Sequence, residues 1–184
     1  QVRVVQVQLE YVDAHRRASL NVGKAFHLLG ASKAADTNAP GLAQINPASL
    51  TFVRTGASFS QTNDWPFKLA TTLAFTGQYS ADPLPTSEQI AFGAQRFASG
   101  YEPGEASGDS GFGASFEINR AIAVGARYVR TFTPYVACDM ARVYLHTGTS
   151  APNKLASVAF GFRVTDNKHY SVDLSIAKAV GDAP

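Results

Sequence analysis

Residues 65–80 read WPFKLATTLAFTGQYS and alternate between apolar and polar side chains along their whole length. A period of two is typical of a β-strand with one apolar and one polar face. Strands of globular proteins have typically about five or six residues, whereas a tilted strand that crosses a bilayer needs roughly 9–11. Aromatic residues stand near both ends of the apolar face, at Trp65 and Tyr79, as they do at the two interfaces of a membrane barrel. Length and aromatic positions therefore favour a transmembrane β-strand.

The same alternation recurs along the chain, and it predicts an all-β protein with sequence neighbours paired in one antiparallel sheet. We predict eight strands, at residues 5–11, 18–30, 50–61, 65–80, 112–119, 131–146, 158–165 and 170–176. The apolar phase predicts that the following side chains face outward: Trp65, Phe67, Leu69, Leu73, Phe75, Phe116, Phe160, Phe162, Leu174 and Ile176.

Two basic residues do not fit the alternation cleanly. Lys24 shares a phase with Leu20, Val22 and Phe26, and a lysine that faces mid-bilayer lipid costs about 2–4 kcal/mol. A β-bulge, a change of register or a nearby acidic partner would resolve the conflict, and otherwise residues 18–30 are not a strand. Arg54 is ambiguous, because the apolar residues around it offer the opposite phase.

The predicted connections differ in length in a regular way. Residues 14–17, 62–64 and 166–168 are tight polar turns, whereas 33–49 and 81–110 are long and rich in Gly, Pro and Ala. Residues 146–154 are intermediate, and 121–130 depart from the rule. Short turns on one rim and long loops on the other are the arrangement of outer-membrane barrels. The pattern favours a membrane barrel and leaves a soluble sandwich or open sheet as the alternative.

Composition excludes several other classes of protein. The 184 residues carry 16 basic and 14 acidic side chains, a net charge of +2 that is too small for a polybasic nucleic-acid surface. With 45% hydrophobic residues the chain is not disordered, and it has no apolar run long enough for a transmembrane helix. Its one cysteine, Cys138, excludes an internal disulfide framework and a cysteine-based zinc site. We expect one domain that has no cofactor or metal and binds no nucleic acid.

Residues 108–111 read GDSG, like the surroundings of the nucleophile in trypsin-type serine proteases. No histidine stands in the matching context, so a loop closed by glycine and aspartate before a strand explains the motif better. The four histidines match no metal-ligand spacing, and Cys138 has no neighbour that would activate its thiol. We therefore predict no catalytic residue and expect that the protein is not an enzyme.

A second pattern begins where residues 65–80 end. Residues 84–93 read LPTSEQIAFG, 96–103 read RFASGYEP and 107–111 read SGDSG, followed by the predicted strand with Glu117. Farther on, residues 134–139 read PYVACD and 158–163 read VAFGFR. In order and spacing these motifs resemble the barrel domain of two-partner secretion transporters, the haemolysin activator and filamentous haemagglutinin transporter family of the Omp85 superfamily. The resemblance covers roughly residues 65–180.

This resemblance implies the C-terminal part of a transmembrane β-barrel in the outer membrane of a Gram-negative bacterium. In the family, the long loop lies between strands eleven and twelve of a sixteen-stranded barrel and folds into the lumen. Residues 1–184 would then supply strands eight to fifteen, as a fragment without the periplasmic POTRA domains and the final strand. The implied function is a pore that exports a large partner protein, with outer-membrane lipid as the other partner. The alternative is an Omp85-like assembly factor or a structural barrel without secretion activity.

The resemblance points to residues of a loop motif, and the polar phase of the strands with its charges predicts the residues that face the lumen. The loop motif comprises Arg96, Ser99, Gly100, Tyr101, Gly108 and Asp109, and the lumen wall comprises Lys68, Glu117, Asp139, Arg163 and Asp173. The family has an arginine before Gly-Tyr that pairs with an acidic residue at the position of Asp139, whereas this sequence has Ser99 there. A serine makes no bond to a carboxylate comparable to the charge-assisted bond of an arginine. We therefore expect Arg96 to pair with Asp139 or Glu117 instead.

Overall fold

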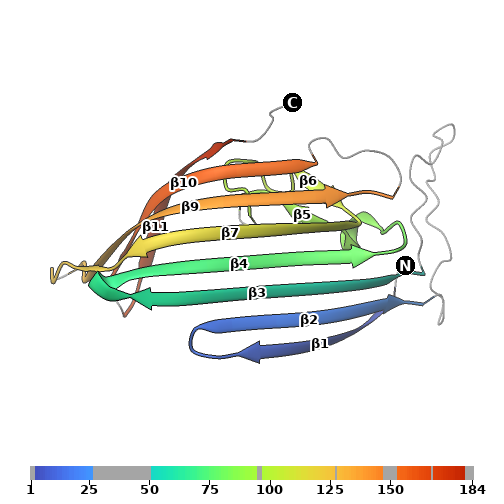
Figure 1. Ribbon diagram of the computed structural model, residues 1–184, viewed down its shortest axis with the longest axis horizontal. Helices are drawn as coiled ribbons and strands as arrows, with labels where there is room; N and C mark the ends of the chain where they lie inside the picture. Colours follow the sequence, from blue (N-terminus) through green and yellow to red (C-terminus); the bar gives the residue numbers. More distant parts are fainter. Residues whose placement is uncertain are drawn as a thin grey trace.

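The computed structural model describes residues 3–26, 51–94, 97–126, 128–146, 153–166 and 168–180. Eight long strands form one antiparallel sheet in sequence order (Figure 1). They are β1 (Val4–Val12), β2 (Arg16–Ala25), β3 (Val53–Trp65), β4 (Leu69–Ser80), β7 (Ser110–Arg120), β9 (Thr131–Tyr144), β10 (Lys154–Thr165) and β11 (Ser171–Ala179). The predicted all-β fold and the pairing of sequence neighbours are confirmed.

Short elements complete the described part of the chain. β8 (Ile122–Ala123) pairs with the start of β9, and β5 (Ile90–Phe92) pairs with β6 (Ala106–Gly108) in a hairpin separate from the main sheet. Single 3-10 turns lie at Pro66–Lys68 and Thr86–Glu88. Within the described residues no helix is long and apolar enough to cross a membrane.

The sixteen-residue strand predicted at 65–80 is wrong at its start. Trp65 is the last residue of β3, and a tight turn at Pro66–Lys68 precedes β4. Pro66 has no N–H for a strand ladder, and Phe67 and Lys68 have left-handed φ values of 64° and 59°. The turn continues the apolar–polar alternation in sequence alone, so the pattern concealed it. The turn expected at 62–64 therefore lies within β3, and Lys68 lies in the turn instead of on a strand.

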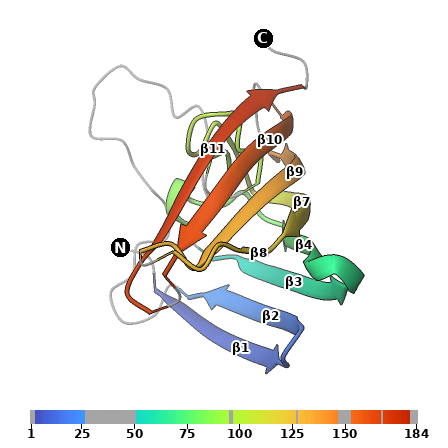
Figure 2. The same ribbon diagram turned by 90° about the vertical axis from the view of Figure 1, so that its left-hand side faces the viewer.

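The sheet is strongly curved, and its two faces differ in polarity. In Figure 2 the strands form an arc, and β5 and β6 lie on its concave side. Of the ten side chains predicted to face outward, eight are exposed, with Phe160 60% and Ile176 80% exposed, while Leu69 and Phe162 are half-buried. The residue pairing places nine of the ten on the convex face, and Phe67 lies in the turn. The convex face is therefore apolar along the strands, as expected of a surface that meets lipid.

The pairing of β2 resolves both ambiguous basic residues. β2 pairs continuously with β1 and β3, and Lys24 lies opposite Val5 and Val53 on the convex face. Lys24 is the second-last residue of β2, and its Nζ lies 5.4 Å from the centroid of the Phe26 ring. A lysine near a strand end can extend its amine to the membrane interface, so no bulge or change of register is needed. Arg54 lies opposite Gly23 and Ser80 on the concave face.

Connections of different length leave opposite edges of the sheet. Residues 13–15 and Pro66–Lys68 form tight connections at the left-hand edge of Figure 1, while residues 81–109, which connect β4 to β7, leave from the right-hand edge. β2 and β9 also end at the right-hand edge, which we call the long-loop rim. We call residues 81–109 the inner loop, because their described part contacts the concave face.

Candidate functional site

Asp109 holds the base of the inner loop. The residue is 1% exposed, and its side chain accepts hydrogen bonds from the backbone N–H groups of Leu84 at 2.8 Å and His146 at 2.9 Å. Gln89 Nε2 donates at 3.1 Å, and His146 Nδ1 lies 3.3 Å away. Burial opposes ionisation of Asp109, but four hydrogen bonds outweigh it and hold the pKa of Asp109 below its ordinary value. They come from the backbone of His146 and Leu84 and from the side chains of Gln89 and His146. Asp109 thus joins both ends of the loop to the end of β9.

A second set of contacts joins the first part of the loop to β3 and β4. Arg54 Nε lies 2.9 Å from Glu88 Oε2, and both side chains are mostly buried. Gln78 Nε2 donates to the Glu88 carbonyl oxygen at 2.9 Å. Sequence reasoning missed this ion pair because it left the phase of Arg54 open; placing Arg54 on the polar phase would have pointed it towards the loop.

The middle of the loop packs on the wall through apolar side chains. The buried cluster comprises Phe92, Ala98 and Ala106 of the loop with Ala141, Val143 and Leu155 of β9 and β10. Gly113 of β7 makes room for it, because a Cβ there would lie 2.7 Å from Phe92 Cε1 and 3.0 Å from Phe97 Cγ. Small residues on the wall therefore let the two aromatic rings lie close to the sheet.

Ser99 contacts Asp139 directly. Ser99 Oγ donates to Asp139 Oδ2 at 2.6 Å, and the Ser99 backbone N–H lies 3.3 Å from the same oxygen. Asp139 is 8% exposed, and Ser157 Oγ on β10 also donates to Oδ2 at 3.4 Å. A short hydroxyl–carboxylate hydrogen bond is charge-assisted and among the stronger kinds. We did not expect Ser99 to form this link from the sequence, and Arg96, the residue expected to do so, lies outside the described residues.

The other residues of the loop motif also lie close to the wall. A Cβ on Gly100 would lie 2.5 Å from the backbone nitrogen of Ala179, and one on Gly108 would lie 2.7 Å from the carbonyl oxygen of Tyr144. These two positions admit only glycine without a shift of β11 or β9. Tyr101 packs against the apolar cluster, and its buried hydroxyl has no hydrogen-bond partner within the described residues.

The wall residues form a network that ties four strands together. Arg163 donates to both carboxylate oxygens of Glu117 at 2.8 and 2.7 Å, and to Asp173 at 2.9 Å. The Tyr135 hydroxyl donates to Asp173 at 2.8 Å, and its ring centroid lies 4.2 Å from the Arg163 guanidinium carbon. Gly161 provides the space, because a Cβ there would lie 2.6 Å from Tyr135 Cζ. We did not predict Tyr135 as a site residue from the sequence, although it lies in the motif at residues 134–139.

The predicted wall residues thus separate into three places. Glu117, Arg163 and Asp173 are together in the network, Asp139 is with the loop, and Lys68 is exposed in the β3–β4 turn. The prediction that Lys68 belongs to the lumen wall is wrong, because the turn at Pro66–Lys68 removes Lys68 from the polar face of a strand.

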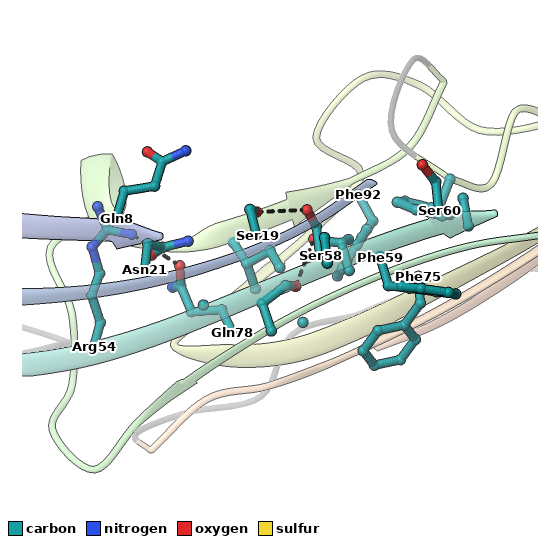
Figure 3. A pocket seen from close by; sticks show the side chains of 18 of the residues that line it. Gln8, Ser19, Asn21, Arg54, Ser58, Phe59, Ser60, Phe75, Gln78 and Phe92 are labelled. Atoms are coloured by element: carbon teal, nitrogen blue, oxygen red, sulfur yellow. Dashed lines mark hydrogen bonds between the residues drawn. The ribbon is translucent and has the colours of Figure 1, made fainter. Parts of the chain in front are cut away.

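A cavity of about 610 Å³ lies between the loop and the concave face of β1–β4 (Figure 3). The strand lining includes the uncharged polar side chains Gln8, Ser19, Asn21, Ser58, Ser60, Thr76 and Gln78, with charged and apolar residues between them. The hydroxyls of Ser19 and Ser58 lie 2.8 Å apart, and Phe92 and Phe97 of the loop complete the lining. Such a surface offers many weak, exchangeable hydrogen bonds.

The motif that resembles a protease sequence is engaged in strand contacts. Ser110 Oγ accepts a hydrogen bond from the Ser80 N–H at 3.0 Å and lies 3.2 Å from the Ser80 carbonyl oxygen. Across the described ranges, no group of three or more His, Cys, Asp or Glu side chains is arranged to hold a metal ion. The arrangement holds a loop and lines a polar cavity.

Comparisons with known proteins agree with this geometry. The family model described as "Haemolysin secretion/activation protein ShlB/FhaC/HecB" matches residues 6–164. CdiB from Escherichia coli superposes with a TM-score of 0.70 at 19% identity, covering 97% of this chain and 32% of that one. CdiB from Acinetobacter baumannii superposes with a TM-score of 0.64 at 17% identity, covering 96% of this chain and 29% of that one. The chain thus spans about a third of either structure and shares the fold of that part. No curated protein matches the sequence.

Proposed function

Because the chain belongs to the haemolysin secretion/activation protein family, whose model matches residues 6–164, we propose that it is the wall of an outer-membrane pore that exports a partner protein. The family is one of secretion transporters and not of enzymes. The observation that carries the proposal is the inner loop, which is held on the concave face by Ser99 and Asp139 beside a polar cavity. We propose further that the strands of this chain correspond to strands eight to fifteen of a larger barrel.

The cavity lining supports passage of an extended chain. Ser, Thr, Asn and Gln side chains can exchange hydrogen bonds with a moving backbone, and each exchange has a small net free energy because water competes for the same groups. Fixed charges would hold oppositely charged segments more strongly. Four charged residues of the described chain line this cavity: Arg54 and Glu88 are paired with each other, and Glu10 and Arg17 carry opposite charges.

The loop contacts support a role in coupling the wall to transport. Its base is held by Asp109, its middle by apolar packing, and its tip by the short bond from Ser99 to Asp139. A loop held at several separate places can release its tip while its base stays attached. We regard the contact between Ser99 and Asp139 as the part that responds to a passing chain.

Export of the partner by the full-length protein tests the proposal. Cells that express both proteins would be compared for partner in the medium, with barrel insertion measured by heat-modifiable migration on gels. Asp139→Ala should reduce export while the barrel still inserts. Lys68→Gln is the control, because Lys68 lies exposed in the turn before β4, at the opposite end of that strand from the inner loop.

Two results would contradict the proposal. Export that is unchanged by Ser99→Ala and by Asp139→Ala would show that the anchored loop has no part in transport. Loss of other outer-membrane proteins on deletion, with export of the partner intact, would instead favour the assembly factor.

A further inference from the structure

We propose that the convex face at the long-loop rim binds a phosphate group of the glycolipid in the outward-facing leaflet, through Arg142 and Lys154. The proposal rests on the proposed function, because it needs the convex face to meet an outer membrane. It goes beyond that function by assigning a lipid site to residues that have no role in the loop or the cavity.

Arg142 and Lys154 form an unneutralised pair on the apolar face. Arg142 of β9 lies opposite Lys154, the first residue of β10, and opposite Phe112 of β7. Its neighbours on the same face, Met140 and Tyr144, are exposed apolar side chains. Like charges directly opposite each other on neighbouring strands are destabilising. An anion between them would turn this repulsion into attraction.

No carboxylate of the described strands supplies that anion. The acidic residues of the long strands all fall on the concave phase: Glu10, Asp64, Glu117, Asp139 and Asp173. The chain between β9 and β10 includes residues 147–152, which read TGTSAP and contain no acid. Arg142 Nε is buried without a hydrogen-bond partner within the described residues. A buried guanidinium donor that no group of the described residues satisfies is consistent with a ligand from outside the chain.

An apolar pocket of about 430 Å³ lies on the side of Arg142 away from Lys154, because its lining includes Phe112, the partner of Arg142 on β7. Its lining includes Tyr79, Phe112 and Tyr144 of the convex face, with Leu145 beyond the end of β9. The guanidinium carbon of Arg142 lies 5.0 Å from the centroid of the Tyr144 ring, so the charge and the pocket share a wall. A cationic pair beside an apolar pocket matches an amphiphile, with its phosphate on the cations and an acyl chain in the pocket.

The position of Arg142 and Lys154 along their strands indicates which leaflet of the membrane they face. Arg142 and Lys154 lie within two residues of the strand ends at the long-loop rim, which is the extracellular side in outer-membrane barrels. Lys24 and Lys178 are also convex-face cations next to a strand end at this rim. The outward-facing leaflet of such a membrane consists of glycolipid with phosphate groups on its sugar headgroup. Arginine suits this chemistry, because its planar donors bind phosphate in a bidentate way.

Lipid titration of the full-length protein tests the site. The protein would be placed in phosphatidylcholine nanodiscs and titrated with lipid A, dephosphorylated lipid A or phosphatidylglycerol, with bound lipid counted by native mass spectrometry. The double variant Arg142→Gln, Lys154→Gln should bind lipid A about thirtyfold more weakly than the unaltered protein, from two cations at the membrane surface. Arg120→Gln is the matched control, because Arg120 lies on the convex face at the opposite end of β7.

The outcomes separate this site from the proposed function. A loss of lipid A binding in the double variant, but not in Arg120→Gln, supports the proposal, even if the protein exports no partner. Equal binding of dephosphorylated lipid A, equal binding of phosphatidylglycerol, or no effect of the double variant would overturn it, even if export proceeds normally. Single variants at Arg142 and at Lys154 keep the test decisive if the double variant fails to insert.

Discussion

Replacing Ser99 with alanine should free the tip of the inner loop and leave the sheet intact. The substitution removes the 2.6 Å hydrogen bond to Asp139, while Asp139 keeps the longer contacts at 3.3 Å to the backbone N–H and at 3.4 Å to Ser157. A hydrogen bond to a charged group contributes about 1.5–3 kcal/mol. Because two weaker donors remain, we expect the lower part of that range, about 1.5–2 kcal/mol, which corresponds to roughly 10- to 30-fold more frequent opening.

Hydrogen exchange of the full-length protein in lipid measures this opening. The Tyr101 amide donates to the Ala98 carbonyl oxygen at 3.2 Å and reports on the tip. Its exchange should accelerate by the factor given above in Ser99→Ala, remain slow in Ser99→Thr, which retains a hydroxyl, and leave the amides of β3 and β4 unaffected. Unchanged Tyr101 exchange in both Ser99→Ala and Asp139→Asn would refute the reasoning, because it would mean that apolar packing alone holds the tip.

Three further predictions concern the loop base, the wall and the lipid face. The folded-state pKa of Asp109 lies below its ordinary value of 3.8. The stabilising contribution of Asp109 is therefore complete above about pH 5 and is lost as the pH falls through the lowered pKa. Hydrogen exchange at the loop base should show this acid sensitivity, and Asp109→Asn should remove the sensitivity. Gly161→Ala should displace Tyr135, because a Tyr135 ring atom would lie 2.6 Å from the new methyl group. We expect the free energy of unfolding in urea to fall by about 1–3 kcal/mol. If the cause is the lost hydrogen bond of the Tyr135 hydroxyl, the double variant Gly161→Ala, Tyr135→Phe should be no less stable than Gly161→Ala alone. Ile176→Lys should cost about 2–4 kcal/mol in a lipid bilayer, as measured by the folding equilibrium in vesicles, while Ser175→Lys on the concave face should cost much less; equal costs would show that β11 does not meet lipid.

The period of two predicted the eight long strands, their order and their faces, but not the short strands β5, β6 and β8. It holds along β10 and along β11 because every residue on one phase of a strand meets the same environment. It failed at Pro66–Lys68, where a three-residue turn preserved the alternation and concealed the end of a strand. Pro66 offered a warning, since proline is excluded from the interior of a sheet ladder.

The loop contacts were harder to predict because they depend on shape. The resemblance indicated which segment meets the wall, but charge considerations pointed to Arg96 and underrated Ser99, whose short side chain suits a loop that lies close to the wall. Period and charge do not encode the distance between two backbones. The glycines at 100, 113 and 161 carry that information, since each lies where a methyl group would strike an atom of another segment.

The apolar cluster under the inner loop makes the two halves of the concave face unequal. Ala141, Val143 and Leu155 lie against the loop and are shielded from water, whereas the polar residues of β2–β4 border an open cavity. One side of the arc therefore supports the loop and the other borders the cavity. A substitution that enlarges side chains on β9 would lift the loop into the cavity, while one on β2 would narrow the cavity from the opposite side. The same reduction in free cross-section would then arise by two routes, and only the first would also loosen the loop.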